Sequence, residues 1–180
     1  MVTIRDFVRA DADAVGALVI AIQRYEFGLD VTFDDQPDLI DIDTHYRRGR
    51  GNFWVALICD AIVGTLGLID IGLRHGVMRK LFVAKEFRGE PFCVANALLI
   101  ALLRHAAAAG LQDLSVGTTA DFVAAQRFYA KHGFGETSPR NLPANFPFTP
   151  IDARFFRRDL ARLAAYQANL DPANRRTTEP

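Results

Sequence analysis

The chain has 180 residues, 50% of them hydrophobic, which is enough for one compact domain with a substantial core. Its 21 basic residues balance 21 acidic ones, so the charge of the whole chain gives no support for binding nucleic acid or an anionic membrane. Two cysteines, Cys59 and Cys93, are too few for a disulfide framework. The sequence also shows no signal-peptide pattern and no apolar run of membrane-spanning length, so we expect a cytoplasmic protein.

The N-terminal part predicts a strand followed by two helices. Residues 2–8 alternate as a strand does, and Asp11 is the expected N-cap of a helix that ends before Gly28. Pro37 is placed to begin a second, shorter helix, which ends near Arg48.

The middle of the chain predicts three strands. Residues 53–59 and 62–71 form a hairpin, which places Cys59 in a buried strand. A third strand covers residues 77–83, after a turn through residues 74–76.

The second half alternates helices and strands. The apolar spacing over residues 92–109 predicts a long helix, followed by a short buried strand at 114–117 and a helix at 122–132. Residues 138–150 contain four prolines and are therefore neither a helix nor a central strand. A last strand is expected over residues 153–160.

This order predicts an α/β (α+β) fold with a central mixed sheet and helices on both faces. We expect residues 1–160 to form a single domain, and residues 161–180 to form a C-terminal helix and a flexible polar tail.

An anion-binding site is predicted where the strand ending at Val83 leads into a helix. The connecting loop holds Arg88 and Gly89. The first amides of a helix have no intrahelical acceptor, and the helix dipole places partial positive charge there. Gly89 lets the backbone approach a phosphate closely, and Arg88 adds a fixed charge with a forked set of donors.

A second segment, Arg-Phe-Tyr-Ala-Lys-His-Gly-Phe at residues 127–134, is typical of a helix that ends in a glycine cap. The two segments together resemble the GNAT superfamily of acyl-CoA N-acyltransferases. The resemblance covers residues 2–160 and is strongest over 81–134. It implies a GNAT-like fold and an N-acetyltransferase that moves an acetyl group from acetyl-CoA, its co-substrate, to an unidentified primary amine. It also implies a chain that can form a homodimer. The four histidines do not cluster at metal-ligand spacing, so we expect no metal, and the balanced charge leads us to expect no nucleic-acid or membrane partner.

The resemblance assigns the coenzyme site residue by residue. The family pattern is Arg or Gln, two residues, Gly, one residue, and Gly or Ala. Arg88 matches its first position, but Pro91 and Cys93 replace the two small residues, and proline removes one amide donor. The implied coenzyme-binding residues are Leu81, Phe82, Val83, Arg88, Gly89, Glu90, Phe92, Cys93, Val94, Ala95, Thr118 and Ala125.

Tyr129 is the implied catalytic residue, because a tyrosine here lies near the coenzyme sulfur in GNAT enzymes and can protonate the departing thiolate. Many members also have an asparagine seven residues earlier, where this chain has Phe122. Thr118, Thr119 or Gln126 could supply the lost polar contact.

No general base is identified from the sequence. Members often use a glutamate on the strand before the phosphate loop, but residues 77–83 contain no carboxylate. Asp70, Glu26, His75 and a water chain all stay open as candidates.

Other residues have two interpretations each. Cys93 is either a thiol activated by the helix end and Arg88 or a small residue in a glycine-like position. Basic residues around the loop, Arg79 and Lys80 among them, could attract coenzyme phosphates. Acceptor specificity is expected in residues 25–43 and 139–150.

Because the loop departs from the family pattern, two other functions stay open. One is a non-catalytic acyl-CoA-binding or sensing module, and the other is an interaction domain that has lost the ligand.

Overall fold

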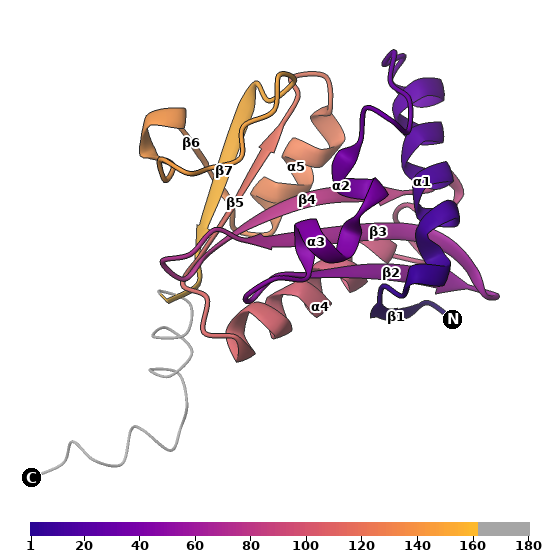
Figure 1. Ribbon diagram of the computed structural model, residues 1–180, viewed down its shortest axis with the longest axis horizontal. Helices are drawn as coiled ribbons and strands as arrows, with labels where there is room; N and C mark the ends of the chain where they lie inside the picture. Colours follow the sequence, from indigo (N-terminus) through magenta and orange to yellow (C-terminus); the bar gives the residue numbers. More distant parts are fainter. Residues whose placement is uncertain (162–180) are drawn as a thin grey trace, which may run out of the picture.

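The computed structural model describes residues 1–161, which share one mixed sheet with helices on both faces (Figure 1). This confirms the predicted fold class. The strand order is β1-β2-β3-β4-β5-β7-β6, and every neighbouring pair is antiparallel except β4 and β5. The strands are β1 (Thr3–Asp6), β2 (Asn52–Ile58), β3 (Ala61–Asp70), β4 (His75–Val83), β5 (Asp113–Thr118), β6 (Gly135–Thr137) and β7 (Arg154–Asp159).

The helices cover the two faces of the sheet and create two cores. The α-helices are α1 (Ala12–Ala21), α2 (Pro37–Ile40), α3 (Ile42–Tyr46), α4 (Val94–Ala108) and α5 (Val123–Lys131). Short segments of other helical types are η1 (Arg9–Asp11), η2 (Ile22–Glu26), η3 (Lys85–Phe87) and η4 (Pro139–Asn141). Residues of α1, α2 and α3 pack on one face. Residues of α4 and α5 share the larger core on the other.

Cys59 is exposed, so its predicted burial in a strand is wrong. It forms the β2–β3 turn with Asp60, and both residues have left-handed backbones, with φ of 48° and 62°. Two-residue turns with positive φ match the twist of a hairpin, which is why the strand stops one residue early.

The β3–β4 turn also lies elsewhere than expected. Gly72, Leu73 and Arg74 have positive φ and form the turn, whereas His75 already pairs with Asp113 in β5. The predicted turn at residues 74–76 is therefore correct only for Arg74, because His75 and Gly76 already belong to the buried start of β4.

Three further differences concern element ends. Asp11 does not cap α1 with its side chain, because its carboxylate accepts hydrogen bonds from Arg5 and from the Val8 amide. The short strand β6 was not predicted, and it lies at the sheet edge against β7. The predicted C-terminal helix and tail fall almost entirely outside the described residues.

The parallel strands β4 and β5 are paired along only part of their lengths. The paired residues are His75–Met78 on β4 and Asp113–Val116 on β5. Beyond Met78, β4 continues to Val83 but pairs only with β3, and the end of β5 pairs only with β7. Figure 1 shows the two strands diverging. Their facing edges therefore carry backbone groups that do not satisfy one another.

Candidate active site

The open edge of β4 and the start of α4 adjoin each other, as the sequence predicted. Leu81, Phe82 and Val83 follow the last residue that pairs with β5. The chain then passes through η3 and Arg88 to α4, which begins at Val94. The predicted coenzyme residues between Leu81 and Ala95 therefore follow the chain from the open end of β4 to the N-terminus of α4, whereas Thr118 lies in β5 and Ala125 in α5.

The first turn of α4 presents unpaired backbone donors. The Cys93 amide donates to the Gly89 carbonyl at 2.6 Å, but among residues 1–161 no acceptor is found for the amides of Val94, Ala95 and Asn96. A 15-residue helix adds its dipole at this end. These groups suit a phosphate-bearing coenzyme.

Cys93 occupies a glycine-like position. Its φ is 49° and its ψ is 37°, in the left-handed region that glycine adopts most readily. The small cysteine side chain is tolerated here, so the loop keeps a shape that the family pattern reserves for small residues. This favours the second of the two interpretations of Cys93.

Tyr129 lies on α5 and belongs to the larger core, on the face of the sheet that α4 and α5 cover. Its side chain is 5% exposed and packs against Phe134 and Phe156, with ring centroids 5.9 and 5.7 Å away. Burial raises the pKa of its hydroxyl, and the charge of Arg79 lowers that pKa while Asp152 raises it. Tyr129 therefore keeps its proton at physiological pH and is available as a hydrogen-bond donor.

Arg79 approaches from the opposite face, one residue beyond the last β4–β5 pair. Its guanidinium donates two hydrogen bonds of 3.1 Å to Asp152 and a third to the Pro147 carbonyl. A Cβ on Gly117 would lie 2.7 Å from the Asp152 carboxyl carbon, so a glycine in β5 makes room for this pair. Arg79 is thus a structural partner of Asp152 and not a free phosphate ligand.

Lys80 is also drawn away from the phosphate loop. Its ammonium donates to Gln36 Oε1 and lies 3.3 Å from Asp38 Oδ1, both in the segment around α2. Both cations are therefore paired within the chain, Arg79 with Asp152 and Lys80 with Asp38, and the expectation that they attract phosphates stays a prediction. The sequence analysis identified neither Asp38 nor Asp152.

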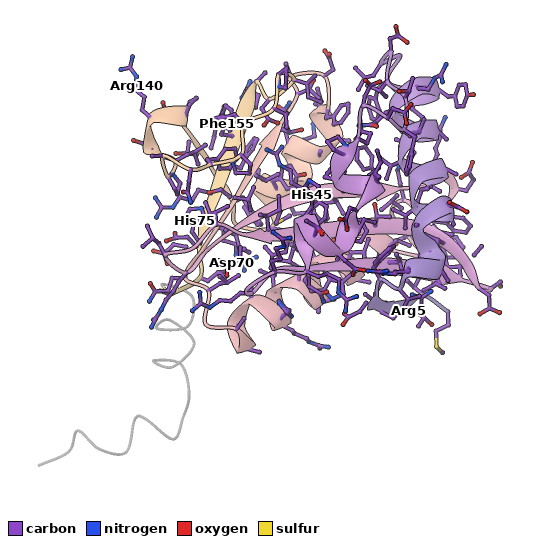
Figure 2. All side chains as sticks on the ribbon, in the orientation of Figure 1. Arg5, His45, Asp70, His75, Arg140 and Phe155 are labelled. Carbon is purple, nitrogen blue, oxygen red and sulfur yellow. The ribbon has the colours of Figure 1, made fainter. Side chains whose placement is uncertain are left out.

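None of the three side chains considered as a general base is free. Glu26 is bound to Arg88, and Asp70 accepts amides of the adjoining loops, from Arg50 and Gly72. His75 is 5% exposed and lies 2.8 Å from Ser115 Oγ. Figure 2 places Asp70 and His75 together by the β3–β4 turn, at the paired end of β4 and not at its open end.

Phe122 contributes an aromatic contact in place of an amide. Its ring lies 4.0 Å from that of Phe27, centroid to centroid, which joins the segment after α1 to the start of α5. Gln126 donates to the carbonyls of Thr119 and Ala120, so it stabilises its own loop. Thr118, the remaining candidate, is buried at the end of β5, with 6% of its surface exposed.

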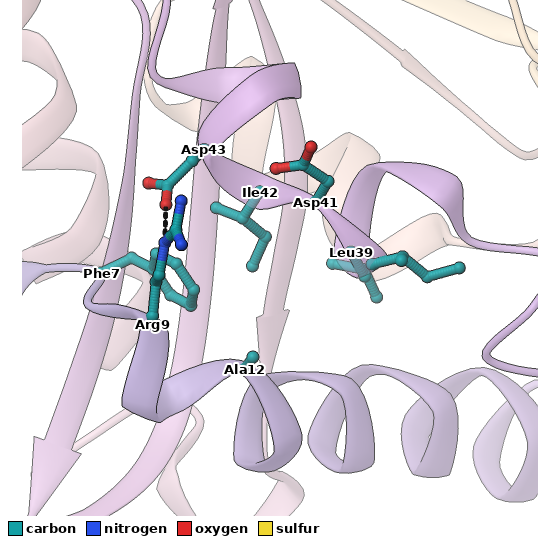
Figure 3. Close-up of a pocket in the computed structure, with 8 residues that line it drawn as sticks. Phe7, Arg9, Ala12, Leu39, Asp41, Ile42 and Asp43 are labelled. Atoms are coloured by element: carbon teal, nitrogen blue, oxygen red, sulfur yellow. Dashed lines mark hydrogen bonds and ion pairs between the residues drawn. The ribbon is translucent and has the colours of Figure 1, made fainter.

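A cavity of about 450 Å³ lies elsewhere, between the start of α1 and the α2–α3 segment (Figure 3). Arg9 and Asp43 form an ion pair of 2.9 Å across its rim, above the buried Phe7, Leu39 and Ile42. None of the predicted coenzyme-binding residues lines it, so it is separate from the candidate coenzyme site.

Comparison with known proteins identifies related sequences. Residues 18–134, more than half of the chain, match the acetyltransferase (GNAT) family. N-acetylaspartate synthetase of Danio rerio is 31% identical over 124 residues, which are 66% of this chain and 43% of that protein. N-acetyltransferase 8F1 of Rattus norvegicus is 28% identical over 110 residues, 58% of this chain and 49% of that protein. The chain spans about half the length of these curated relatives.

Solved structures give the same result. A GNAT-family acetyltransferase from Staphylococcus aureus Mu50 superposes with a TM-score of 0.84 at 32% identity, covering 89% of this chain and 99% of that one. The N-acetylglutamate synthase of Neisseria gonorrhoeae, solved with coenzyme A and N-acetyl-glutamate, has a TM-score of 0.67 at 17% identity. It covers 89% of this chain and 35% of that one, and at this identity it shows the fold alone.

Fold and comparisons together assign the chain to a family of acyltransferases. The chain belongs to the acetyltransferase (GNAT) family, as its two motifs predicted, and members of this family use acetyl-CoA. No helix within residues 1–161 has the length and apolar character needed to span a bilayer.

Proposed function

We propose that the protein transfers an acetyl group from acetyl-CoA to a primary amine, by direct attack of the amine on the thioester. The observation that carries this proposal is the opening between β4 and β5 beyond Met78, together with the unpaired amides at the start of α4. A thioester beside the first and a pyrophosphate beside the second are what an acyl-CoA would supply.

Different groups of the chain bind the coenzyme and assist the reaction. The amides of Val94 and Ala95, with the loop from Arg88 to Cys93, hold the phosphates. The open edge of β4 from Leu81 to Val83 offers backbone partners to the pantetheine arm. Tyr129 donates its proton toward the sulfur as negative charge develops there, although burial makes it a weaker acid than a free phenol. Orienting both reactants in this opening supplies much of the rate increase.

The related proteins suggest which amines to test first as acetyl acceptors. The name of one relative, N-acetylaspartate synthetase, implies an amino acid acceptor for that protein. We therefore place aspartate, glutamate and other amino acids first among the amines to be screened, ahead of polyamines and peptides.

Calorimetric titration with acetyl-CoA, followed by an amine screen with thiol detection, tests the proposal. We expect Arg88→Ala to weaken binding about tenfold, equivalent to ~1.4 kcal/mol, because one charged contact is lost. Lys85→Ala, which removes a neighbouring charge from η3, is the matched control and should change binding little. Binding without thiol release for any amine would favour the alternative, a non-catalytic acyl-CoA-binding module. No binding would reject both.

A further inference from the structure

Lys80 has an unusual backbone at the point where β4 leaves β5. It lies two residues beyond Met78, the last residue paired with β5, in an irregular stretch of the β3–β4 ladder. Its φ is 54°, a left-handed conformation that is strained for a residue other than glycine. The hydroxyl of the fully buried Thr65 donates to the Lys80 carbonyl at 2.7 Å and stabilises this kink.

The kink directs a long basic side chain inward, where only 13% of it stays exposed. Its ammonium is bound by Gln36 and Asp38, and Asp38 Oδ2 in turn accepts the Tyr46 hydroxyl at 2.5 Å. Tyr46 is itself buried. A strained backbone, a partly buried amine and a fixed carboxylate thus occur together where β4 no longer pairs with β5.

The charged groups around Lys80 act on it in opposite directions. Burial is the largest effect and lowers the pKa of the Lys80 amine, the carboxylate of Asp38 raises it, and Arg79 on the same strand lowers it. A lysine in such surroundings gives up its proton more readily than an exposed one.

The carboxylates that could act as bases instead already accept hydrogen bonds or form ion pairs. Asp152 accepts hydrogen bonds from both Nη atoms of Arg79 and from the Thr149 amide. Glu26 accepts hydrogen bonds from both Nη atoms of Arg88. Each oxygen of Asp38 also has a partner. Lys80 also has partners, Gln36 and Asp38, but unlike the guanidinium groups of Arg79 and Arg88 its nitrogen gains a lone pair when it loses a proton.

We propose that Lys80 is the general base of the acetyl transfer, with Asp38 and Tyr46 as its positioning residues. The inference rests on the proposed function. Neutral Lys80 takes a proton from the acceptor nitrogen as the bond from that nitrogen to the acetyl carbon forms. The carbon–sulfur bond breaks, and Tyr129 gives its proton to the leaving thiolate. The Lys80 ammonium is then held by Gln36 and Asp38, and exchange with solvent returns a proton to Tyr129 and removes one from Lys80.

Two substitutions and a direct titration test this role. The chain has three lysines, Lys80, Lys85 and Lys131, so a protein labelled with ¹³C at the lysine ε-carbons gives three assignable signals. We expect the Lys80 signal to titrate below the other two, and to move to a still lower pH in Asp38→Asn, which removes the raising charge. Lys80→Gln and Lys80→Arg should each lower kcat about a hundredfold. Acetyl-CoA affinity by calorimetry should not change, and Lys85→Gln is the control.

The lower limb of the pH profile of kcat/KM separates this role from a structural one. It should move to lower pH in Asp38→Asn and disappear in Lys80→Gln. Normal turnover by Lys80→Arg, or a Lys80 signal that titrates with the other lysines, would overturn the assignment. Loss of the limb in Asp38→Asn alone would make Asp38 the base instead. If the wild-type chain binds acetyl-CoA and acetylates no amine, the proposed function fails first and this inference with it.

Discussion

Arg88 and Glu26 face each other in a two-pronged ion pair, although 62 positions separate them in the sequence. Nη1 donates to Oε2 at 2.7 Å and Nη2 donates to Oε1 at 2.9 Å, while Nε donates to the Val83 carbonyl at 2.7 Å. One arginine therefore joins the helical extension of α1 to the end of β4. A phosphate that uses the same edge of the guanidinium has to displace Glu26.

We therefore predict that Glu26→Gln binds coenzyme A more tightly than the wild type. Because both side chains are partly exposed, breaking the pair costs only about 0.2–1 kcal/mol, which corresponds to an affinity gain of about 1.5- to 5-fold. Calorimetry at low and moderate salt measures it. Glu86→Gln, which removes an equal charge from η3, controls for general electrostatics. An equal gain in both variants, or weaker binding in Glu26→Gln, would contradict the displacement of Glu26 by phosphate.

Tyr129→Phe should lower the single-turnover rate constant about a hundredfold while leaving coenzyme affinity and the melting temperature nearly unchanged. The ring that contacts Phe134 and Phe156 is retained, and only the hydroxyl is lost. Tyr25→Phe, at a side chain that is exposed to solvent, is the matched control. An unchanged rate constant in rapid-quench measurements would remove Tyr129 from the chemistry.

Much of the fold was predictable because its signals are local. The spacing of Leu98, Leu99 and Leu102 predicted one apolar face of the long helix, and all three are fully buried against the sheet. Gly110 ends that helix with a φ of 71°, as a glycine cap does. Such patterns depend on neighbours within one or two turns, so a single sequence contains them.

The polar half of the candidate site was not predictable, because its contacts are distant and come from irregular segments. Arg79 and Asp152 are 73 positions apart, and Lys80 and Gln36 are 44 apart. No periodicity indicates which carboxylate a lysine will meet across a sheet. The kink at Lys80 decides where that side chain goes, and it leaves no mark in the residue types around it.

Cys93→Gly should preserve coenzyme binding and leave stability within about 1 kcal/mol of the wild type. Glycine relieves the left-handed strain of roughly 1–2 kcal/mol but costs about 0.5–1 kcal/mol in unfolded-chain entropy. Cys93→Val should be destabilising and should weaken binding, because a β-branched residue tolerates positive φ poorly. Urea unfolding and calorimetry measure both effects. Equal behaviour of the two variants would show that backbone shape at this position is unimportant.

The buried His75 should make the protein less stable in mild acid. Burial lowers the pKa of its imidazole below the usual 6.5, an effect that Asp113 opposes and Arg157 reinforces. Below about pH 6.5 the unfolded chain therefore binds a proton that the folded chain does not, so the free energy of unfolding falls as the pH drops toward the folded pKa. The loss from this one group is at most about 1.4 kcal/mol per pH unit.

Urea unfolding at pH 7.5, 6.5, 5.5 and 5.0 measures this dependence for the wild type and for His75→Gln, which keeps a polar group near Ser115. The difference between the two free energies should shrink as the pH falls, because the variant has no imidazole to protonate in the unfolded state. His45→Gln, at an exposed histidine of α3, is the control and should run parallel to the wild type. If the free energy of His75→Gln also ran parallel to that of the wild type, the acid sensitivity would come from groups other than His75.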